Sequence, residues 1–520
     1  MKRTTFILAL IAASVSFWWW SSHQPSSTKL SATTIALEGN PATVDPVGVT
    51  DVHSSMVATA VHSPLAWVSG DGNFVPMVAS KIVMGSDAMS LTISLSPQAS
   101  FWDGSAVHPS DVIYSIERYR RSANLHRWIL DRVKGIKEFD EKKTEHISGL
   151  TEAAPTTVKL QFDAPEPDAR LMLCNLSVGI VKAGTGELPP QPFGVQVMGC
   201  GPYIPDGFEP GLFNCRLKSK DDSKPAQLTF RVVSDDQARI QGYRSGSIDI
   251  LRLRGPMISE VTTSVGGKLR ARKDVPGKVS VYPANELNYL ICNWSSQKLV
   301  GIAAQDRRNV LAQLSAKLDR AKLVTELYPA GSAEATASIA PPITGAKPLA
   351  ALAPPSAIEP SPPRKLTLVA ANDSASRQLA VAVQKQLNAS GLEIDAEFVD
   401  LGKLIEKLIK KDFDLMLFWI ELQVPSSGPY AWCSFFDKAA PLSAFGEARD
   451  DISAALGQAR GVPDDSLRAE AFSKVVSLID EHQQSWVPLM SRKAVVIHSE
   501  STLPAFDANG TPINGIIRKQ

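Results

Sequence analysis

The chain has 520 residues, of which 44% are hydrophobic and 21% are charged, and its formal net charge is +1. A chain of this length exceeds one hydrophobic core, so it should fold into two or three lobes. The balanced charge gives no support for a nucleic-acid surface or an anionic-membrane surface as the main role.

The N-terminus has the pattern of an export signal. Lys2 and Arg3 precede an apolar run from Phe6 to Trp20, after which the chain turns polar. This length suits a signal peptide and is short for a membrane-spanning helix. Residues 1–24 are therefore predicted to be a signal peptide. The alternative is an uncleaved anchor with Trp18–Trp20 at the membrane interface.

A strand, a turn and a helix are predicted between residues 90 and 120. The alternation from Leu91 to Leu95 has the period of a half-buried strand. The dipeptide Asp103-Gly104 is typical of a turn, because glycine adopts positive φ at low cost. Pro109 suits the first position of a helix, and the side chain of Asp111 can accept from the free N–H groups of that first turn.

The same stretch resembles the signature of the family 5 extracellular solute-binding proteins, the dipeptide- and oligopeptide-binding components of bacterial ABC importers. The family pattern F-x-D-G-x-x-x-x-A-x-D-V is matched at Phe101, Asp103, Gly104, Asp111 and Val112. Five further stretches resemble family motifs in the same order along the chain: 43–46, 71–79, 201–203, 246–249 and 486–489.

The resemblance implies an α/β fold with two lobes, two hinge crossings near 284–287 and 486–489, and an extra α+β subdomain. The expected divisions are as follows: lobe I at 25–65, 186–285 and 487–520, the extra subdomain at 66–185, and lobe II at 286–486. A Pro/Ala/Ser-rich tract at 329–363 has the composition of a linker, and we interpret it as a loop within lobe II.

Residues 366–420 give the clearest fold signal from periodicity alone. Apolar strands are predicted at Leu366–Ala370, Leu392–Phe398 and Phe413–Ile420, with amphipathic helices between them. The connections have the length of βαβ crossovers, so a parallel sheet covered by helices is expected in this lobe.

Candidate ligand-binding residues follow from that expectation, because ligands bind beyond the carboxyl ends of strands in open α/β sheets. Polar or aromatic residues follow three expected strands, at 287–293, 366–370 and 413–418, and further aromatic residues lie in the loop after the third. The candidates are Asn293, Trp294, Asn372, Asp373, Trp419, Glu421, Tyr430 and Trp432. For the aromatic residues, a place in the core is the alternative.

Glu421 receives the most specific interpretation. In peptide-binding members the matching strand ends in Gly-Trp-x-x-Asp, whose Asp pairs with the α-ammonium of the peptide. Here Phe418 replaces the glycine and the acid comes one residue earlier, as Glu421. A buried carboxylate needs a cation, so a cationic ligand group is one prediction and a solvated loop acid is the other.

A second recognition device of the dipeptide binders is not found. Those proteins carry an arginine that holds the ligand carboxylate after the strand equivalent to 366–370. Here the segment is Ala371–Ser374, and Arg377 falls inside the following helix. A short peptide with a free carboxylate is therefore not predicted, whereas longer peptides and other ligands remain open.

Five cysteines are present, and no pair has the CxxC spacing of a metal site. Cys200 and Cys215 flank a predicted strand–turn–strand, so a disulfide between them is expected in an exported protein. The odd count leaves at least one free thiol.

The sequence thus predicts a periplasmic, non-enzymatic binding protein that captures a peptide or similar small solute between two lobes. It would deliver this ligand to an ABC permease of the inner membrane, as a monomer and without cofactor or metal. Two alternatives stay open. They are an exported hydrolase on a similar scaffold and a membrane-tethered ligand sensor.

Overall fold

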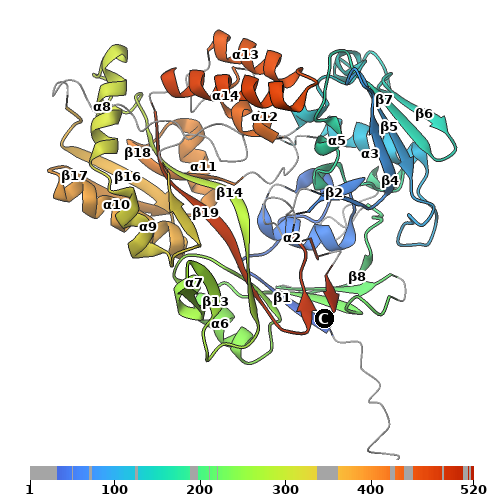
Figure 1. The fold of residues 1–520 in the computed structure, drawn as a ribbon, viewed down its shortest axis with the longest axis horizontal. Helices are drawn as coiled ribbons and strands as arrows, with labels where there is room; N and C mark the ends of the chain where they lie inside the picture. Colours follow the sequence, from blue (N-terminus) through green and yellow to red (C-terminus); the bar gives the residue numbers. More distant parts are fainter. Residues whose placement is uncertain are drawn as a thin grey trace, which may run out of the picture.

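A long mixed sheet runs from β17 at the left of Figure 1 down to β8 at the lower right. The structure is a computed structural model that describes residues 32–519 except 50, 70–72, 123, 125–126, 188–196, 210, 219–220, 337–360, 422–427, 439–448, 483–484, 507–512 and 515–516. Within these ranges the sheet has 11 strands in the order β17-β16-β18-β14-β19-β11-β1-β10-β9-β8, and β15 pairs with β19. The strands are β1 (Ala32–Leu37), β8 (Tyr203–Glu209), β9 (Leu212–Leu217), β10 (Gln227–Val232), β11 (Ile250–Leu253), β14 (Lys278–Cys292), β15 (Ala333–Ala335), β16 (Lys365–Ala371), β17 (Glu393–Val399), β18 (Leu415–Glu421) and β19 (Trp486–His498).

Strands β14 and β19 join the two lobes. They pair antiparallel along most of their length, from Lys278 opposite His498 to Ile291 opposite Trp486. β19 also pairs with β11 of the first lobe, and β14 with β18 of the second lobe. The predicted crossings at 284–287 and 486–489 lie inside these two strands, which are longer than the sequence pattern indicated.

The second lobe confirms the predicted βαβαβ unit. β16 pairs parallel with both β17 and β18. The helices between them are α10 (Ser374–Ala389) and α11 (Leu401–Lys410). Leu379, Val383 and Leu387 of α10 are buried against the sheet, as the spacing of apolar residues predicted.

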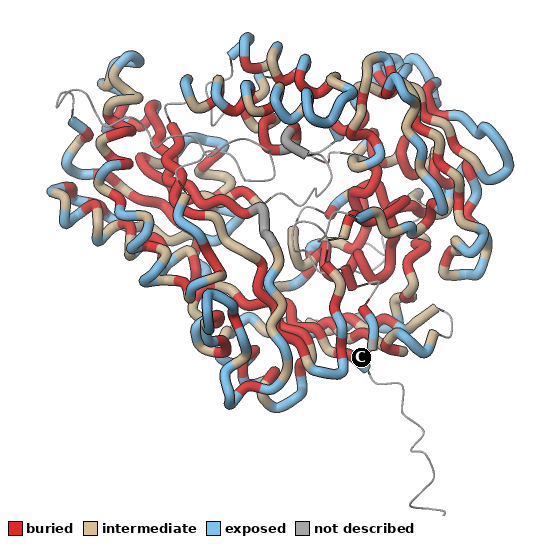
Figure 2. The backbone as a smooth tube through the Cα atoms, in the orientation of Figure 1, coloured by how far each residue is buried: buried red, intermediate tan, exposed pale blue. Residues whose placement is uncertain are grey.

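Helices cover both faces of the long sheet. One face packs on α6 (Asp236–Arg244), α7 (Pro256–Val261), α8 (Ala304–Ala316), α9 (Arg320–Leu327) and α10. The other face packs on α2 (Val52–Val61) in the first lobe, and on α11, α12 (Gly428–Cys433), α13 (Asp450–Arg460) and α14 (Asp465–His482) in the second. Figure 2 shows the buried residues following the sheet and the inner sides of these helices.

The extra subdomain has its own four-stranded sheet and core. Its strands lie in the order β4-β5-β7-β6, with β4 (Ala79–Met84), β5 (Ser90–Leu95), β6 (Leu150–Ala154) and β7 (Thr157–Gln161). Helices α3 (Pro109–Arg121), α4 (Ile136–Asp140) and α5 (Ala169–Met172) accompany them. The predicted turn and helix start are present, because Gly104 has φ +85° and Asp111 Oδ2 accepts from His108 N at 2.8 Å.

Three two-stranded sheets complete the described strands: β2–β3 (Ala66–Val68, Phe74–Pro76), β12–β13 (Thr262–Val265, Lys268–Ala271) and β20–β21 (Thr502–Leu503, Arg518–Lys519). Within the described part of the chain, no helix combines the length and apolarity needed to cross a membrane. The predicted signal or anchor segment 1–24 and most of the Pro-rich tract lie outside the described residues.

The expected disulfide is not formed. All five cysteines are free and buried. The Cys200 Sγ donates to the carbonyl oxygen of Ile180 at 3.2 Å, inside the core of the extra subdomain. Cys215 lies on β9 in the core of the first lobe. The prediction was wrong because the chain between the two cysteines places them in separate cores, which sequence proximity does not reveal.

Candidate functional site

Charged side chains from both lobes meet beside the β14–β19 crossing. Glu38 follows β1, Arg252 lies on β11 and Arg254 follows it, while Glu421 ends β18. β1 and β11 are parallel neighbours in the first lobe, and β18 belongs to the parallel set of the second lobe. The carboxyl ends of the two parallel sets therefore converge here, which is where α/β sheets place their ligands. We call the following residues the junction cluster: Glu38, Arg239, Arg252, Arg254, Glu286, Glu421 and Arg492.

Glu421 is compensated by arginines of the chain itself. Arg252 Nη2 donates to Glu421 Oε1 at 2.6 Å, and Arg254 Nη2 lies 3.5 Å from Oε2. The Glu421 side chain is 10% exposed. Burial alone would raise its pKa, but the positive charges of Arg252 and Arg254 outweigh burial and lower the pKa to about 2. The interpretation of Glu421 as a solvated loop acid was therefore wrong. Arg252 and Arg254 balance the buried negative charge of Glu421, so no cationic ligand group is needed for that balance.

A second ion pair lies on the crossing strands next to Glu421. Glu286 of β14 is the register partner of Glu421 and also of Arg492 on β19. The Arg492 guanidinium contacts the Glu286 carboxylate and donates to the Tyr328 hydroxyl at 3.3 Å. Although burial opposes the charged form, the Glu286 carboxylate raises the pKa of Arg492. The acids of two adjacent strands are thus separately neutralised by arginines of the first lobe and of the crossing.

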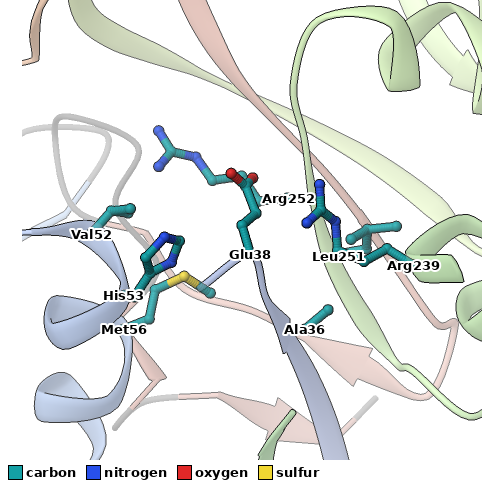
Figure 3. A pocket seen from close by; sticks show the side chains of 8 residues that line it. All are labelled: Ala36, Glu38, Val52, His53, Met56, Arg239, Leu251 and Arg252. Carbon is teal, nitrogen blue, oxygen red and sulfur yellow. The ribbon is translucent and has the colours of Figure 1, made fainter. Parts of the chain in front are cut away.

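A small cavity opens beside the cluster, between β1, β11 and α2 (Figure 3). Glu38 and Arg252 point into it from the strands, and His53 faces them from α2. Burial lowers the pKa of His53, so the imidazole is neutral at pH 7. Arg252 Nη1 is buried without a hydrogen-bond partner among the described residues. Arg254 is 26% exposed and lies 3.8 Å from the Glu38 carboxylate. Arg252 therefore keeps donor capacity toward this space.

Strand direction separates the predicted site residues into two groups. Trp419 and Glu421 lie at the carboxyl end of β18, and Asn372 and Asp373 follow the parallel strand β16. β14 runs antiparallel to β18, with Cys292 opposite Leu415, so the residues after β14 lie at the opposite edge of the sheet. The expectation that Asn293 and Trp294 share an edge with Glu421 was wrong, because periodicity does not give strand direction.

Asn293 and Trp294 have structural partners at that opposite edge. Asn293 Nδ2 donates to the carbonyl oxygens of Lys411 and Phe413, each at 2.7 Å. Trp294 is 7% exposed in the core of the second lobe, and the Arg307 guanidinium lies 5.8 Å from its ring. These contacts account for both side chains without a ligand.

Asn372 and Asp373 are exposed and start α10. Asp373 Oδ1 accepts from Ser376 N at 3.0 Å as the N-cap, and the Asn372 oxygen accepts from Arg377. Their neighbour Ala375 faces the backbone of Gly255 at the start of α7, so α10 contacts the first lobe here.

The aromatic candidates lie apart from the junction cluster or against the core. Trp432 is 1% exposed, and its Nε1 donates to the Tyr289 hydroxyl at 3.2 Å. Tyr430 is 7% exposed and packs against Trp128 of the extra subdomain, with the ring centres 4.8 Å apart. Trp419 is half-buried beside Phe418, with 6.0 Å between the ring centres. Of the aromatic candidates, Trp419 alone lies on the same strand end as Glu421.

Sequence reasoning missed Arg252 and Arg254. They stand in LRLRG directly after the Ile248-Asp249 motif. Two arginines alternating with leucines at the end of a predicted strand were the available signal. Among the described residues, no group of three or more His, Cys, Asp or Glu side chains could hold a metal ion.

Comparison with known proteins decides the family. The model of the bacterial extracellular solute-binding proteins, family 5 (middle region), matches residues 73–440. The chain belongs to this family. This membership confirms solute binding, the function class that the order of the motifs predicted. No curated protein sequence matches the chain.

Solved structures share the fold at low identity. OppA of Haemophilus influenzae in complex with RPPGFSPFR has a TM-score of 0.77 and 14% identity, over 94% of this chain and 99% of that one. The dipeptide-binding protein of Pseudoalteromonas sp. SM9913 in complex with Met-Leu has a TM-score of 0.76 and 15% identity, over 94% and 100%. The murein tripeptide-binding protein MppA of Escherichia coli has a TM-score of 0.75 and 17% identity, over 94% and 98%. The solute-binding protein thus has the two-lobe fold of periplasmic binding proteins.

Proposed function

We propose that the protein captures a peptide between its two lobes and delivers it to an ABC permease of the inner membrane. Family membership supports solute binding. Proteins of the same fold include OppA in complex with a nonapeptide, a dipeptide-binding protein in complex with Met-Leu and a murein tripeptide-binding protein. The location of the proposed binding site rests on one observation. Arg252 of β11 and Glu421 of β18 meet in an ion pair between the lobes. In this proposal the protein is exported by residues 1–24, acts in the periplasm as a monomer and has no catalytic step. We also propose that the lobes have the boundaries predicted from the sequence.

The charge balance of the junction cluster favours one kind of peptide. Glu421 is neutralised by Arg252 and Arg254, so a ligand ammonium is not needed to offset its desolvation. An ammonium placed there would also lie near both guanidinium groups. The proposed ligand is therefore a peptide held through its backbone and side chains, with its amino terminus away from Glu421. Trp419 is the aromatic residue that we propose lies beside it.

Native mass spectrometry of the purified protein, followed by denaturation, would identify any ligand that is carried through purification. Peptides of two to nine residues would then be tested by calorimetry in free and N-acetylated form. We expect binding, with free and acetylated forms of one sequence within about threefold of each other, roughly 0.6 kcal/mol. Strong binding of the free amines alone would contradict the proposed recognition mode, and no binding by any peptide would contradict the peptide ligand.

The same incubations separate binding from hydrolysis. Mass spectra of the peptides after prolonged incubation should show no cleavage products. A product that disappears with one substitution in the junction cluster would favour the hydrolase alternative. N-terminal sequencing of the exported protein would distinguish a released protein from a tethered sensor.

A further inference from the structure

The extra subdomain and the second lobe touch at a site remote from the β14–β19 crossing. In Figure 1 helices α12–α14 extend over the upper part of the molecule to the side of β4–β7 and α5. The contact joins residues about 300 positions apart in the sequence, such as Asp168 and Arg468. We name the contact by six residues: Trp128, Glu166 and Asp168 on the subdomain, and Tyr430, Arg460 and Arg468 on the second lobe.

An aromatic and guanidinium stack forms one half of this contact. The rings of Trp128 and Tyr430 lie 4.8 Å apart. The Arg460 guanidinium lies 4.3 Å from the Tyr430 ring centre and 5.7 Å from that of Trp128. Trp128 also packs against the cores of both the subdomain and the second lobe. Cation–π contacts of this kind gain strength when water is excluded, so the stack favours the assembled arrangement.

Two ion pairs form the other half. Arg460 Nε lies 2.6 Å from Glu166 Oε2, and both side chains are at most 5% exposed. Arg468 Nη2 donates to Asp168 Oδ1 at 3.1 Å, with side chains 12% and 6% exposed. In addition, Arg132 Nη2 donates to the carbonyl oxygen of Gly457 at 2.8 Å. Each of these charged groups thus lies near an opposite charge or a carbonyl oxygen on the facing element.

Charged side chains make up much of this contact. Permanent contacts between domains are large and apolar, whereas polar contacts between domains permit relative motion. Charged groups regain water when the surfaces part, so the desolvation cost of the pairs falls on the assembled state alone. The facing surfaces belong to a subdomain that packs on the first lobe through α2 and β2 and to helices of the second lobe. Any movement of the two lobes about β14 and β19 must therefore make or break this contact.

We propose that these six residues form a latch, a second contact between the lobes that holds the closed arrangement and opens when the lobes separate. The latch sets the balance between open and closed forms independently of what occupies the cleft. The latch depends on motion of the two lobes and not on a peptide ligand. The latch proposal can therefore be tested separately from the proposed function.

Charge reversal at the more accessible pair tests the latch in the full chain. Nitroxide labels would be placed at Glu152→Cys on β6 and Glu470→Cys on α14, both exposed positions, since the native cysteines are buried. Pulsed dipolar spectroscopy on the protein as purified then reports the distance distribution between subdomain and second lobe. Asp168→Arg or Arg468→Asp should raise the long-distance population at least about twofold. The double reversal should restore the original distribution.

Two further measurements keep the outcome clear. The exposed pair of Lys403 and Glu406 on α11, 3.0 Å apart, serves as the matched control, and its reversal should leave the distribution unchanged. If a reversal prevents folding, Arg468→Gln leaves the buried Asp168 carboxylate without its cation and should produce a smaller shift in the same direction. A distribution that is unchanged in all variants, or a double reversal that does not restore it, would overturn the latch.

Discussion

The Arg252 guanidinium and the Glu421 carboxylate join the two lobes of the protein. Arg252 Nη2 donates to Glu421 Oε1 at 2.6 Å, between the ends of β11 and β18. These strands are not neighbours, since β14 and β19 lie between them in the sheet. The ion pair therefore depends on the relative position of the two lobes across β14 and β19, and it also neutralises the charge of Glu421.

Replacing Glu421 with Gln should destabilise the protein. The substitution removes the partner of Arg252 and leaves its guanidinium buried beside a neutral amide. We expect the free energy of unfolding to fall by about 3 kcal/mol, as when one member of a buried ion pair is lost. Urea denaturation monitored by tryptophan fluorescence measures this change. Glu406→Gln, on the exposed surface of α11, is the control and should show no measurable change.

The same carboxylate should contribute to acid sensitivity. Its pKa is lowered from 4.5 to about 2, although burial opposes this direction, because Arg252 and Arg254 stabilise the charged form. A lowered acid pKa gives stability that is present above pH 4.5 and is lost as pH falls toward 2. The difference between wild type and Glu421→Gln should therefore shrink across this interval. A constant difference from pH 5 to pH 2 would show that Glu421 does not carry the effect.

Substitutions of Asn293 should affect stability and leave ligand affinity unchanged. Its amide nitrogen donates to two backbone carbonyls, of Lys411 and Phe413. Asn293→Ala should cost about 1–3 kcal/mol, because both carbonyls lose their donor. Asn293→Asp should cost more, because a carboxylate would face the two oxygens. Differential scanning fluorimetry and calorimetry on one preparation separate the two effects. A loss of affinity without a loss of stability would return Asn293 to the binding site.

The five thiols should be free and unreactive in the folded protein. Burial raises the pKa of Cys174, Cys200 and Cys292 to about 12 and that of Cys215 upward as well, so little thiolate exists at pH 8. Iodoacetamide should modify none of them quickly in native buffer. In urea without reductant all five should be alkylated, as intact mass would show. Addition of three groups would instead indicate a disulfide.

Acidification should favour the closed arrangement of the latch. Burial raises the pKa of Glu166 to about 7 despite the attraction of Arg460 and Arg132. Parting of the surfaces would expose the carboxyl group and return its pKa toward 4.5, so the closed form binds more protons between pH 4.5 and 7. Lowering pH from 8 to 5.5 should therefore reduce the long-distance population between the labels. Asp168 on the same segment also acts on Glu166. Tyr430 on α12 lies against Arg460, and Arg468 on α14 pairs with Asp168.

Glu166→Gln is the control for this pH effect. Asp168 also has its pKa raised by burial and contributes in the same direction, so a small residual response is expected in the variant. If wild type and Glu166→Gln respond equally to pH, the effect belongs to other groups.

Local chemistry determined much of what the sequence predicted correctly. The capped helix at Pro109 and the alternation from Leu91 to Leu95 depend on neighbours within a few residues, and both appear as expected. The βαβαβ unit of the second lobe followed from apolar periodicity and crossover length. The ordered motifs identified the family because they mark such local structures at fixed places along the chain.

The direction of strands and the partners of charges were decided only by the tertiary structure. Asn293 was assigned to the wrong edge of the sheet, because the pattern of an antiparallel strand equals that of a buried parallel one. Cys200 and Cys215 are close in sequence and yet lie in different cores. Glu421 is visible in the sequence as an acid at a strand end, but its cations come from residues about 170 positions earlier. The pKa and the ion-pair partners of a charged side chain depend on the groups within a few ångströms of it. Only folding brings those groups together.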